Sequence, residues 1–368
     1  MNKRKLISIG AAFVTGLASS ALMASERIPA GEIETLYSFG TEVPPGNIAI
    51  APSGRMFMSV HEFYGKDIRV VEVKAGGAVT PYPNSDWAKI PEGDGPGLNG
   101  VLGLRADRQG ILWMLDAQTQ THSGRIVGWD TTNESLHRVV YLGAPITKPT
   151  SFLNDLAVDR THEAIYITDT ASADTSALIV VNLDTGQARR VLEGSDFTRP
   201  EDKKMVIDGK VVMLGEAPAK IGANPITVDP TDTWVYFAPM TASSMYRIKT
   251  SDLLDFSLTD DELAMRVENY GSKPISDGST VDGGGNVYVT SITDDSIGVI
   301  RPNGNYETLY ARDDISWPDG FAYGPDHKIY VTVNELHRSP VLNSGKDDTK
   351  GEFKIMRFDA LDEGVSGR

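Results

Sequence analysis

Short segments that alternate apolar and polar residues recur along the chain, separated by turns rich in Gly, Asp and Pro. In residues 275–290, one such segment ends at Val281 and Asp282, three glycines follow at 283–285, and a second begins at Val287. Alternation with a period of two residues is typical of β-strands, and glycine readily adopts the positive φ of a tight turn. The segment therefore predicts a β-hairpin.

The same hairpin pattern occurs five more times, with an aromatic residue at a fixed place in its second strand. These aromatic residues are Phe57, Trp113, Tyr166, Tyr236, Tyr288 and Tyr330. They follow one another at intervals of 56, 53, 70, 52 and 42 residues. Strand-built repeats of about 40–50 residues are typical of β-propeller blades. The pattern therefore predicts an all-β fold, a six-bladed β-propeller that spans residues 30–362.

The last repeat has a third strand but no chain left for a fourth. Residues 33–40, IETLYSFG, resemble residues 306–312, YETLYAR, which form the fourth strand of the fifth repeat. We therefore predict that the N-terminal strand completes the last blade and closes the ring, which removes an exposed sheet edge. Residues beyond Leu361 are expected to fray.

Three segments depart from the repeat. Residues 251–263 have the composition of one short helix. Residues 193–222 are an insertion that predicts a small hairpin or loop over one face, and residues 336–351 are a second long loop. Loops of this length are usually either functional lids or disordered. A surface elaboration without function is an equally valid interpretation of the first insertion.

The N-terminus has the three parts of a secretory signal: basic residues at 3–5, an apolar stretch at 6–17 and small residues up to Ala24. We therefore predict a signal peptide over residues 1–24 and a secreted or periplasmic location. An uncleaved membrane anchor is the alternative. The chain has no Cys and a net charge of −15, so disulfides are excluded and nucleic acid or an anionic membrane is disfavoured as a partner. We expect a monomer that does not contact the membrane after signal cleavage.

The residues that begin the first strand of each repeat share one chemistry. In a propeller this strand lines the central channel, so its first residue faces the channel mouth. All of these residues are Asn or Asp: Asn47, Asn99, Asn154, Asn224, Asp277 and Asp319. Converging oxygen donors of this kind suit a hard cation such as Ca²⁺. The alternative is that Asn and Asp occur there because they favour turns.

Three further residues could contact a ligand near the mouth. His61 and His337 each follow a second strand, and Trp317 lies beside Asp319, where it could stack on a ligand. Both histidines could equally be loop residues held by the backbone. The sequence contains no G-x-S-x-G elbow, H-E-x-x-H, P-loop or Rossmann fingerprint.

Several strings resemble the major royal jelly protein/yellow family in its bacterial, dopachrome-tautomerase-related branch. They include SFLNDLAVD from Ser151, ALIVVNLDTGQARRVL from Ala177 and SWPDGFAYGPDHKIYVTVNELH from Ser316. The resemblance implies a six-bladed propeller, in agreement with the repeat. It implies no single activity, because the family includes pigment-related proteins, food proteins and binders of small amines.

The chain is more distantly similar to the gluconolactonase/regucalcin family, in which a Glu, an Asn and an Asp hold a divalent cation. That similarity implies metal ligation by Asn224 and Asp277, and substrate contact by Asn154. Asn47 takes the place of the family's Glu, so Asp319 would have to supply the missing charge. It also implies that Asp277 positions or deprotonates an attacking water as the catalytic residue.

Together these features predict an exported propeller that binds a small molecule in a polar central channel, with Ca²⁺ as the candidate cofactor. A metal-dependent hydrolase of the lactonase type is the first alternative. A protein-interaction scaffold is the second, and whether the chain is an enzyme stays open at this point.

Overall fold

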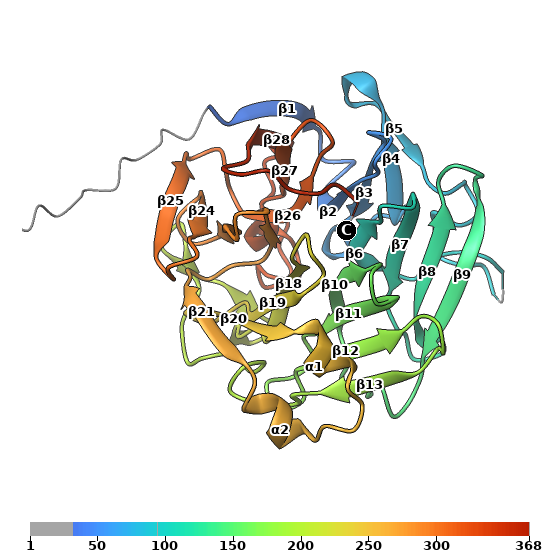
Figure 1. Cartoon of the computed structure of the whole chain (residues 1–368). Coiled ribbons are helices and arrows are strands. Elements are labelled where there is room, and N and C mark those ends of the chain that lie inside the picture. Colours follow the sequence, from blue (N-terminus) through green and yellow to red (C-terminus); the bar gives the residue numbers. More distant parts are fainter. Residues whose placement is uncertain (1–31, 94, 368) are drawn as a thin grey trace, which may run out of the picture.

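The computed structural model of the chain describes residues 32–93 and 95–367. The predicted signal peptide, residues 1–24, lies outside them. Figure 1 shows sheets arranged as blades around a central axis, and the described residues form six four-stranded sheets. The prediction of an all-β, six-bladed propeller is therefore confirmed.

Within blades 1 to 5, the strands follow one another from the axis to the rim in sequence order. Blade 1 comprises β2 (Pro45–Ile50), β3 (Met56–Val60), β4 (Val70–Val73) and β5 (Val79–Pro81). Blade 2 comprises β6 (Val101–Ala106), β7 (Ile111–Asp116), β8 (Gly124–Asp130) and β9 (Ser135–Leu142). Blade 3 comprises β10 (Leu153–Asp159), β11 (Ala164–Asp169), β12 (Ala177–Asn182) and β13 (Ala188–Val191).

The second half of the ring repeats this order. Blade 4 comprises β18 (Ala223–Val228), β19 (Trp234–Pro239), β20 (Ser244–Lys249) and β21 (Glu268–Ser272). Blade 5 comprises β22 (Ser279–Val281), β23 (Val287–Ser291), β24 (Ser296–Ile300) and β25 (Tyr306–Ala311). Blade 6 comprises β26 (Pro318–Tyr323), β27 (Lys328–Val333), β28 (Phe353–Asp359) and the N-terminal β1 (Glu34–Phe39).

The ring is closed by strands from the two ends of the chain. β1 pairs antiparallel with β28, from Glu34 opposite Arg357 to Phe39 opposite Phe353. The prediction that the N-terminal strand completes the last blade is confirmed.

The repeated aromatic residues form the core between blades, and all six are buried. In four blades the polar end of the ring donates a hydrogen bond to an Asp of the preceding turn. The pairs are Trp113 with Asp107 at 2.8 Å, Tyr166 with Asp159 at 2.9 Å, Tyr288 with Asp282 at 2.7 Å and Tyr330 with Asp326 at 2.7 Å. Each ring therefore buries a large apolar surface while its polar atom keeps a partner.

A bulge interrupts the first strand of most blades near the channel mouth. The register of the inner pair shifts in blades 1, 2, 3, 4 and 6. A hydroxyl from the second strand accepts a hydrogen bond from the irregular segment, as Thr332 does from the Gly320 amide at 3.0 Å. The same hydroxyl donates to the next blade, to the Gly46 carbonyl. Ser59 and Thr168 donate in the same way to the Leu102 and Asn224 carbonyls, each at 2.8 Å.

The helix expected over residues 251–263 is wrong in its extent, because two short helices take its place. They are α1 (Thr250–Leu254) and α2 (Asp260–Ala264). Between them the Asp255 carboxylate accepts a hydrogen bond from the Ser257 amide, which favours a turn over a continuous helix. Thr259 then caps α2 through a capping box with Glu262.

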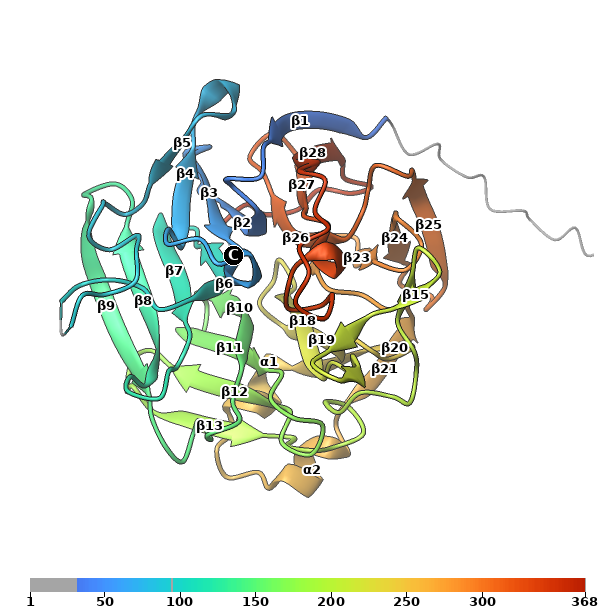
Figure 2. The same cartoon turned by 180° about the vertical axis from the view of Figure 1, so that it is seen from behind.

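The insertion at 193–222 contains two small hairpins rather than one. They are β14 (Val206–Ile207) with β15 (Lys210–Val211), and β16 (Met213–Leu214) with β17 (Ala217–Pro218). Figure 2 shows β15 on the face opposite to that of Figure 1. The buried apolar residues of the insertion pack against Trp317 and against the second long loop. That loop begins with a 3₁₀ turn (Leu336–Arg338). Two further 3₁₀ turns, Glu62–Tyr64 and Ala75–Gly77, lie in blade 1.

The expectation that residues beyond Leu361 fray is also wrong. The backbone amides of Leu361 and Gly364 donate to the hydroxyls of Tyr288 and Tyr323, at 2.6 and 2.8 Å. The tail ends near the central axis (Figure 1), where Val365 and Gly367 line a cavity of about 20 Å³. The tail therefore covers one end of the channel. No helix among the described residues is long and apolar enough to cross a membrane.

We predict that Thr332→Val lowers the free energy of unfolding by about 2 kcal/mol, because it leaves the buried Gly320 amide and Gly46 carbonyl without this partner. Urea unfolding of the variant measures the effect. Thr308→Val, on the exposed side of β25, is the control and should change the free energy by less than about 0.5 kcal/mol. Equal effects of the two substitutions would contradict a role for the hydroxyl in joining the blades.

Candidate functional site

A cavity of about 390 Å³ occupies the channel mouth opposite the C-terminal tail. Its floor is polar and its walls are apolar. The floor contains Gly46, Asn47, Leu102, Asn154, Asp155, Asn224, Asp277 and Asp319. The walls include His61, Phe63, Phe152, Met205, Met240, Trp317, Leu336 and Leu342. Residues from all six blades and from both insertions therefore meet at one place.

The register of the inner strands fixes which residue of each blade faces the mouth. Each repeated aromatic pairs with one inner-strand residue, such as Ala157 opposite Tyr166 and Ala322 opposite Tyr330. The mouth residue lies three positions before it. The six mouth residues are Gly46, Leu102, Asn154, Asn224, Asp277 and Asp319.

Two of the predicted mouth positions need correction. Asn47 lies one residue deeper than the mouth, at the position of Asp155 in blade 3, although it still lines the cavity. Asn99 precedes β6 and does not line the cavity, because the register of blade 2 places Leu102 at the mouth; the Asn99 backbone amide donates to Asp116 at 2.6 Å. The number of residues between the first Asn or Asp of a repeat and the inner-strand residue opposite the aromatic differs between blades. The first Asn or Asp therefore does not mark a fixed structural position.

Asp277 is the most enclosed acid of the mouth, with 7% of its surface exposed. One carboxylate oxygen accepts from the Asn224 amide at 2.9 Å and the other from the Trp317 indole at 2.7 Å. Burial raises the pKa of Asp277 to about 6, and the charge of Asp155 adds to the shift. Asp277 is therefore a carboxyl that titrates near neutral pH.

Asp319 is the second acid of the mouth. Its carboxylate accepts from the Asn334 amide at 2.7 Å. Burial raises its pKa well above the ordinary range, and the charges of Asp277 and Asp155 raise it further. Because like charges at short range disfavour ionisation, ionisation of either mouth carboxyl raises the pKa of the other.

The two mouth amides differ in their partners. Asn224 donates its amide nitrogen to Asp277, whereas the described residues provide no hydrogen-bond partner for the Asn154 side chain. A polar group enclosed without a partner is costly unless water or a ligand satisfies it. Asn154 is therefore available to a bound molecule.

A charged network fills the channel directly beneath the mouth. The Arg105 guanidinium donates to Asn47 at 2.9 Å and to Asp155 at 2.8 Å, and Asn47 donates to Asp155 at 3.1 Å. The neighbouring blade approaches so closely that a Cβ on Gly320 would lie 2.2 Å from the Asn47 oxygen. The network therefore blocks the channel, and the cavity opens on one face only.

The predicted ligand residues outside the floor have different environments. His61 lines the cavity, and its Nδ1 accepts from the Phe63 amide at 3.3 Å, so the neutral ring carries its proton on Nε2. Burial lowers the pKa of His61 to about 3, so the ring is neutral at pH 7. His61 can therefore offer a ligand a hydrogen bond but no charge.

Trp317 and His337 stack on each other with ring centroids 6.0 Å apart and an angle of 12° between planes. Trp317 is 1% exposed, and its indole nitrogen is occupied by Asp277. His337 does not line the cavity, and burial lowers its pKa to about 4. Trp317 thus holds the Asp277 carboxylate through its indole nitrogen, and His337 packs against the Trp317 ring.

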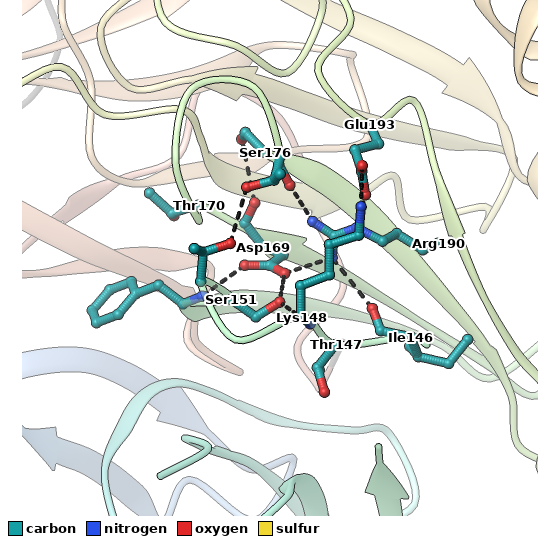
Figure 3. A network of polar contacts seen from close by, with 12 residues as sticks. Ile146, Thr147, Lys148, Ser151, Asp169, Thr170, Ser176, Arg190 and Glu193 are labelled. Carbon is teal, nitrogen blue, oxygen red and sulfur yellow. Dashed lines mark hydrogen bonds and ion pairs between the residues drawn. The ribbon is translucent and has the colours of Figure 1, made fainter. Parts of the chain in front are cut away.

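A buried network in blade 3 fixes one wall of the cavity (Figure 3). Asp169 accepts from the Phe152 amide at 2.7 Å and from Arg190 at 2.6 Å, and it also contacts Ser151. Arg190 in turn pairs with Glu193, at the start of the first insertion. The Phe152 ring faces Phe63 across the wall, with centroids 6.2 Å apart.

Sequence reasoning missed Arg105, Asp155 and the Asp169 network. A signal for Arg105 was present, because the equivalent inner-strand residues are small in the other blades: Ala49, Ala157, Thr227, Thr280 and Ala322. A charged residue in that place indicates a partner inside the channel. The Asp169 network leaves no such pattern, because its members are scattered over three loops and two strands.

The fold and the site define a propeller with a blind, apolar-walled cavity over a polar floor. The model of the major royal jelly protein family matches residues 99–362, more than half of the chain. The chain belongs to this family, which confirms the resemblance found in the sequence. No curated protein matches the chain in sequence.

Solved structures share the fold at low sequence identity. A gluconolactonase from Xanthomonas campestris is 13% identical with a TM-score of 0.57, covering 90% of this chain and 91% of its own. A luciferin-regenerating enzyme is 13% identical with a TM-score of 0.57, covering 91% and 98%. Regucalcin from Agrobacterium tumefaciens, a calcium-binding protein, is 13% identical with a TM-score of 0.53, covering 92% and 98%. At this identity the likeness is one of fold.

We predict that the pKa of Asp277 makes stability depend on pH. The folded-state pKa of about 6 exceeds the ordinary value of 3.8, so the folded chain holds the proton more tightly than the unfolded chain. Stability from this group is therefore greatest at low pH and is lost as pH rises through 6. Relative to Asp277→Asn, the free energy of unfolding should fall by on the order of 2 kcal/mol between pH 4 and pH 7.

Urea unfolding of both chains at several pH values measures this difference. Asp184→Asn, at an exposed turn, is the control and should follow the unsubstituted chain. A difference between Asp277→Asn and the unsubstituted chain that stays constant with pH would contradict the raised pKa.

Proposed function

We propose that this chain is an exported member of its family that binds a small organic molecule in the mouth cavity. A polar floor beneath apolar walls is the observation that carries the proposal, because ligand sites are usually apolar clefts with a few placed polar groups. The signal-like residues 1–24 support export.

The floor favours a head group rich in hydrogen-bond donors. Asp277 and Asp319 offer carboxylate oxygens, and Asn154 has an amide without a partner among the described residues. A primary ammonium matches this set, because it donates three hydrogen bonds and its charge relieves the repulsion between the two acids. The net charge of −15 also favours a cationic ligand over an anionic one.

The walls favour an apolar body for the same ligand. Phe63, Phe152 and Met240 line the cavity above the floor. Aromatic and methionine side chains bind apolar groups by burial and by ring contacts. A polyol without an apolar part would leave these walls in contact with water, so it fits the cavity less well.

We predict that 2-phenylethylamine binds with saturable heat in calorimetry and that 2-phenylethanol, its neutral analogue, binds at least tenfold more weakly. Asp277→Asn and Asp319→Asn should each weaken amine binding at least tenfold, because each removes a carboxylate from an enclosed site. Binding should also weaken as pH falls below about 6, where Asp277 takes up a proton. Asp184→Asn is the matched control.

Equal affinity for the amine and the alcohol, or full affinity in both mouth variants, would overturn the proposed head group. Absence of binding by either compound would favour the interaction scaffold instead.

Divalent cation binding with lactone hydrolysis is the second candidate function. The donor set fits a hard cation in charge and chemistry, with two carboxyls and two amides at the mouth, from Asn154, Asn224, Asp277 and Asp319. Blades 1 and 2 contribute Gly46 and Leu102, which have no donor side chain. Among residues 32–93 and 95–367, no three His, Cys, Asp or Glu side chains form a metal-binding group.

The Asp277 carboxylate, held at the cavity floor by Asn224 and Trp317, is the observation that favours hydrolysis, because a positioned carboxylate can act as a general base. A bound cation would supply Lewis acidity toward a carbonyl oxygen. Asp277 would accept the proton of the attacking water, and Asn154 would orient the lactone. Trp317 and Asn224 would hold the Asp277 carboxylate in place.

We predict for this candidate that millimolar Ca²⁺ raises the melting temperature of chelator-treated protein by a few degrees, since a ligand that binds the folded state stabilises it. Asp319→Asn should abolish the increase, and Asp184→Asn should keep it. The protein should also hydrolyse δ-valerolactone, with kcat/KM reduced at least a hundredfold by Asp277→Asn. An unchanged melting temperature with Ca²⁺ would exclude this candidate and leave amine binding intact.

A further inference from the structure

The two insertions carry large apolar side chains that are exposed. Val206, Val211, Leu214 and Val341 are exposed by 42, 37, 45 and 37%. Val206 and Val211 are opposite each other in the β14–β15 hairpin, and Leu214 follows in β16. Exposed apolar residues are ordinary when scattered, but a group of them beside a cavity indicates a binding surface.

Two of these residues belong to the cavity as well as to the surface. Leu214 and Val341 line the cavity while more than a third of each remains exposed. They continue an apolar wall that begins deeper with Met205 and Leu342, which are buried. The apolar lining therefore continues from inside the cavity to exposed side chains at this rim, where Lys220 also lines the cavity.

The rim is held together by contacts between the two insertions. The Asp208 carboxylate, at the tip of the β14–β15 hairpin, accepts a hydrogen bond from Arg338 at 2.7 Å. Beneath this ion pair the apolar residues of both insertions form one cluster with Trp317. Leu214 and Val341 are thus presented on a joined structure rather than on two independent loops.

The position of the rim constrains what can enter. The Arg105 network blocks the channel below the floor, so a ligand enters and leaves on the insertion side. A ligand whose head reaches Asp277 and Asp319 has its other end directed toward that side. If this end were short or polar, binding would bury none of the exposed apolar surface of Leu214 and Val341.

We propose that the cavity takes an amphiphile, with a donor-rich head on the polar floor and an unbranched apolar chain that leaves over Leu214 and Val341. This inference rests on the proposed binding function and names the ligand class. The chain covers the exposed apolar side chains, and their burial adds to the affinity in proportion to chain length.

Calorimetry with primary n-alkylammonium ions of four, six, eight and ten carbons, each below its micelle concentration, tests the proposal. The affinity should rise about threefold to fourfold for each added methylene until the chain passes the rim. The octyl ion should therefore bind about a hundredfold more tightly than the butyl ion. In the double variant Leu214→Ser/Val341→Ser this ratio should fall below about tenfold.

Leu136→Ser is the matched control, because Leu136 is exposed by 46% on the outer strand β9, outside the cavity lining. It should retain the full ratio between the octyl and butyl ions. The chain-length series on the unsubstituted protein needs no variant, so the proposal remains open to refutation even if the double variant folds poorly.

The outcomes separate this inference from the proposed function. Butyl and octyl ions that bind with equal affinity would overturn the amphiphile and leave the binding site standing. Absence of binding at every chain length would overturn both. If the rim instead packs against a second copy of this chain, sedimentation will show a dimer that Leu214→Ser/Val341→Ser dissociates, with a flat chain-length series, and the amphiphile is then excluded.

Discussion

The architecture of the site depends on hydroxyl groups that join neighbouring blades at the channel mouth. Thr332, Ser59 and Thr168 each donate to a mouth carbonyl of the following blade, and the same hydroxyls accept amides from the strand irregularity of their own blade. A bulge by itself leaves backbone groups without ladder partners, which is costly when buried. The hydroxyls remove that cost and fix the position of the backbone that carries the mouth side chains.

This arrangement of the backbone holds two acidic side chains, Asp277 and Asp319, in an enclosed place where ionisation is costly. Asp277 and Asp319 lie in an enclosed mouth above Asp155, and only Asp155 has a full ion-pair partner, in Arg105. Hydrogen bonds from Trp317, Asn224 and Asn334 hold the two mouth acids without neutralising them. The floor would thus gain from a positive charge, and both insertions and Phe152 form the walls above it.

The fold was predictable because its signals are local and repeated. An aromatic residue at one place in the second strand marks each blade in the sequence. The likeness between residues 33–40 and 306–312 predicted the ring closure. The site was predictable only in part. Asn154, Asn224, Asp277 and Asp319 were placed correctly at the mouth, but Asn47 and Asn99 were not, because strand starts and bulges shift the register. Arg105, the tail and the two linked insertions depend on contacts between residues distant in sequence.

The pairing of β1 with β28 has a consequence for how the molecule is made. The paired residues Glu34 and Arg357 lie 323 residues apart in sequence, so the ring cannot close until β28 has been synthesised. Until then β1 has no strand partner and can pair with other chains. A protein built in this way gains from being kept unfolded until it is complete, and a product that terminates early lacks the strand partner needed to become a stable ring.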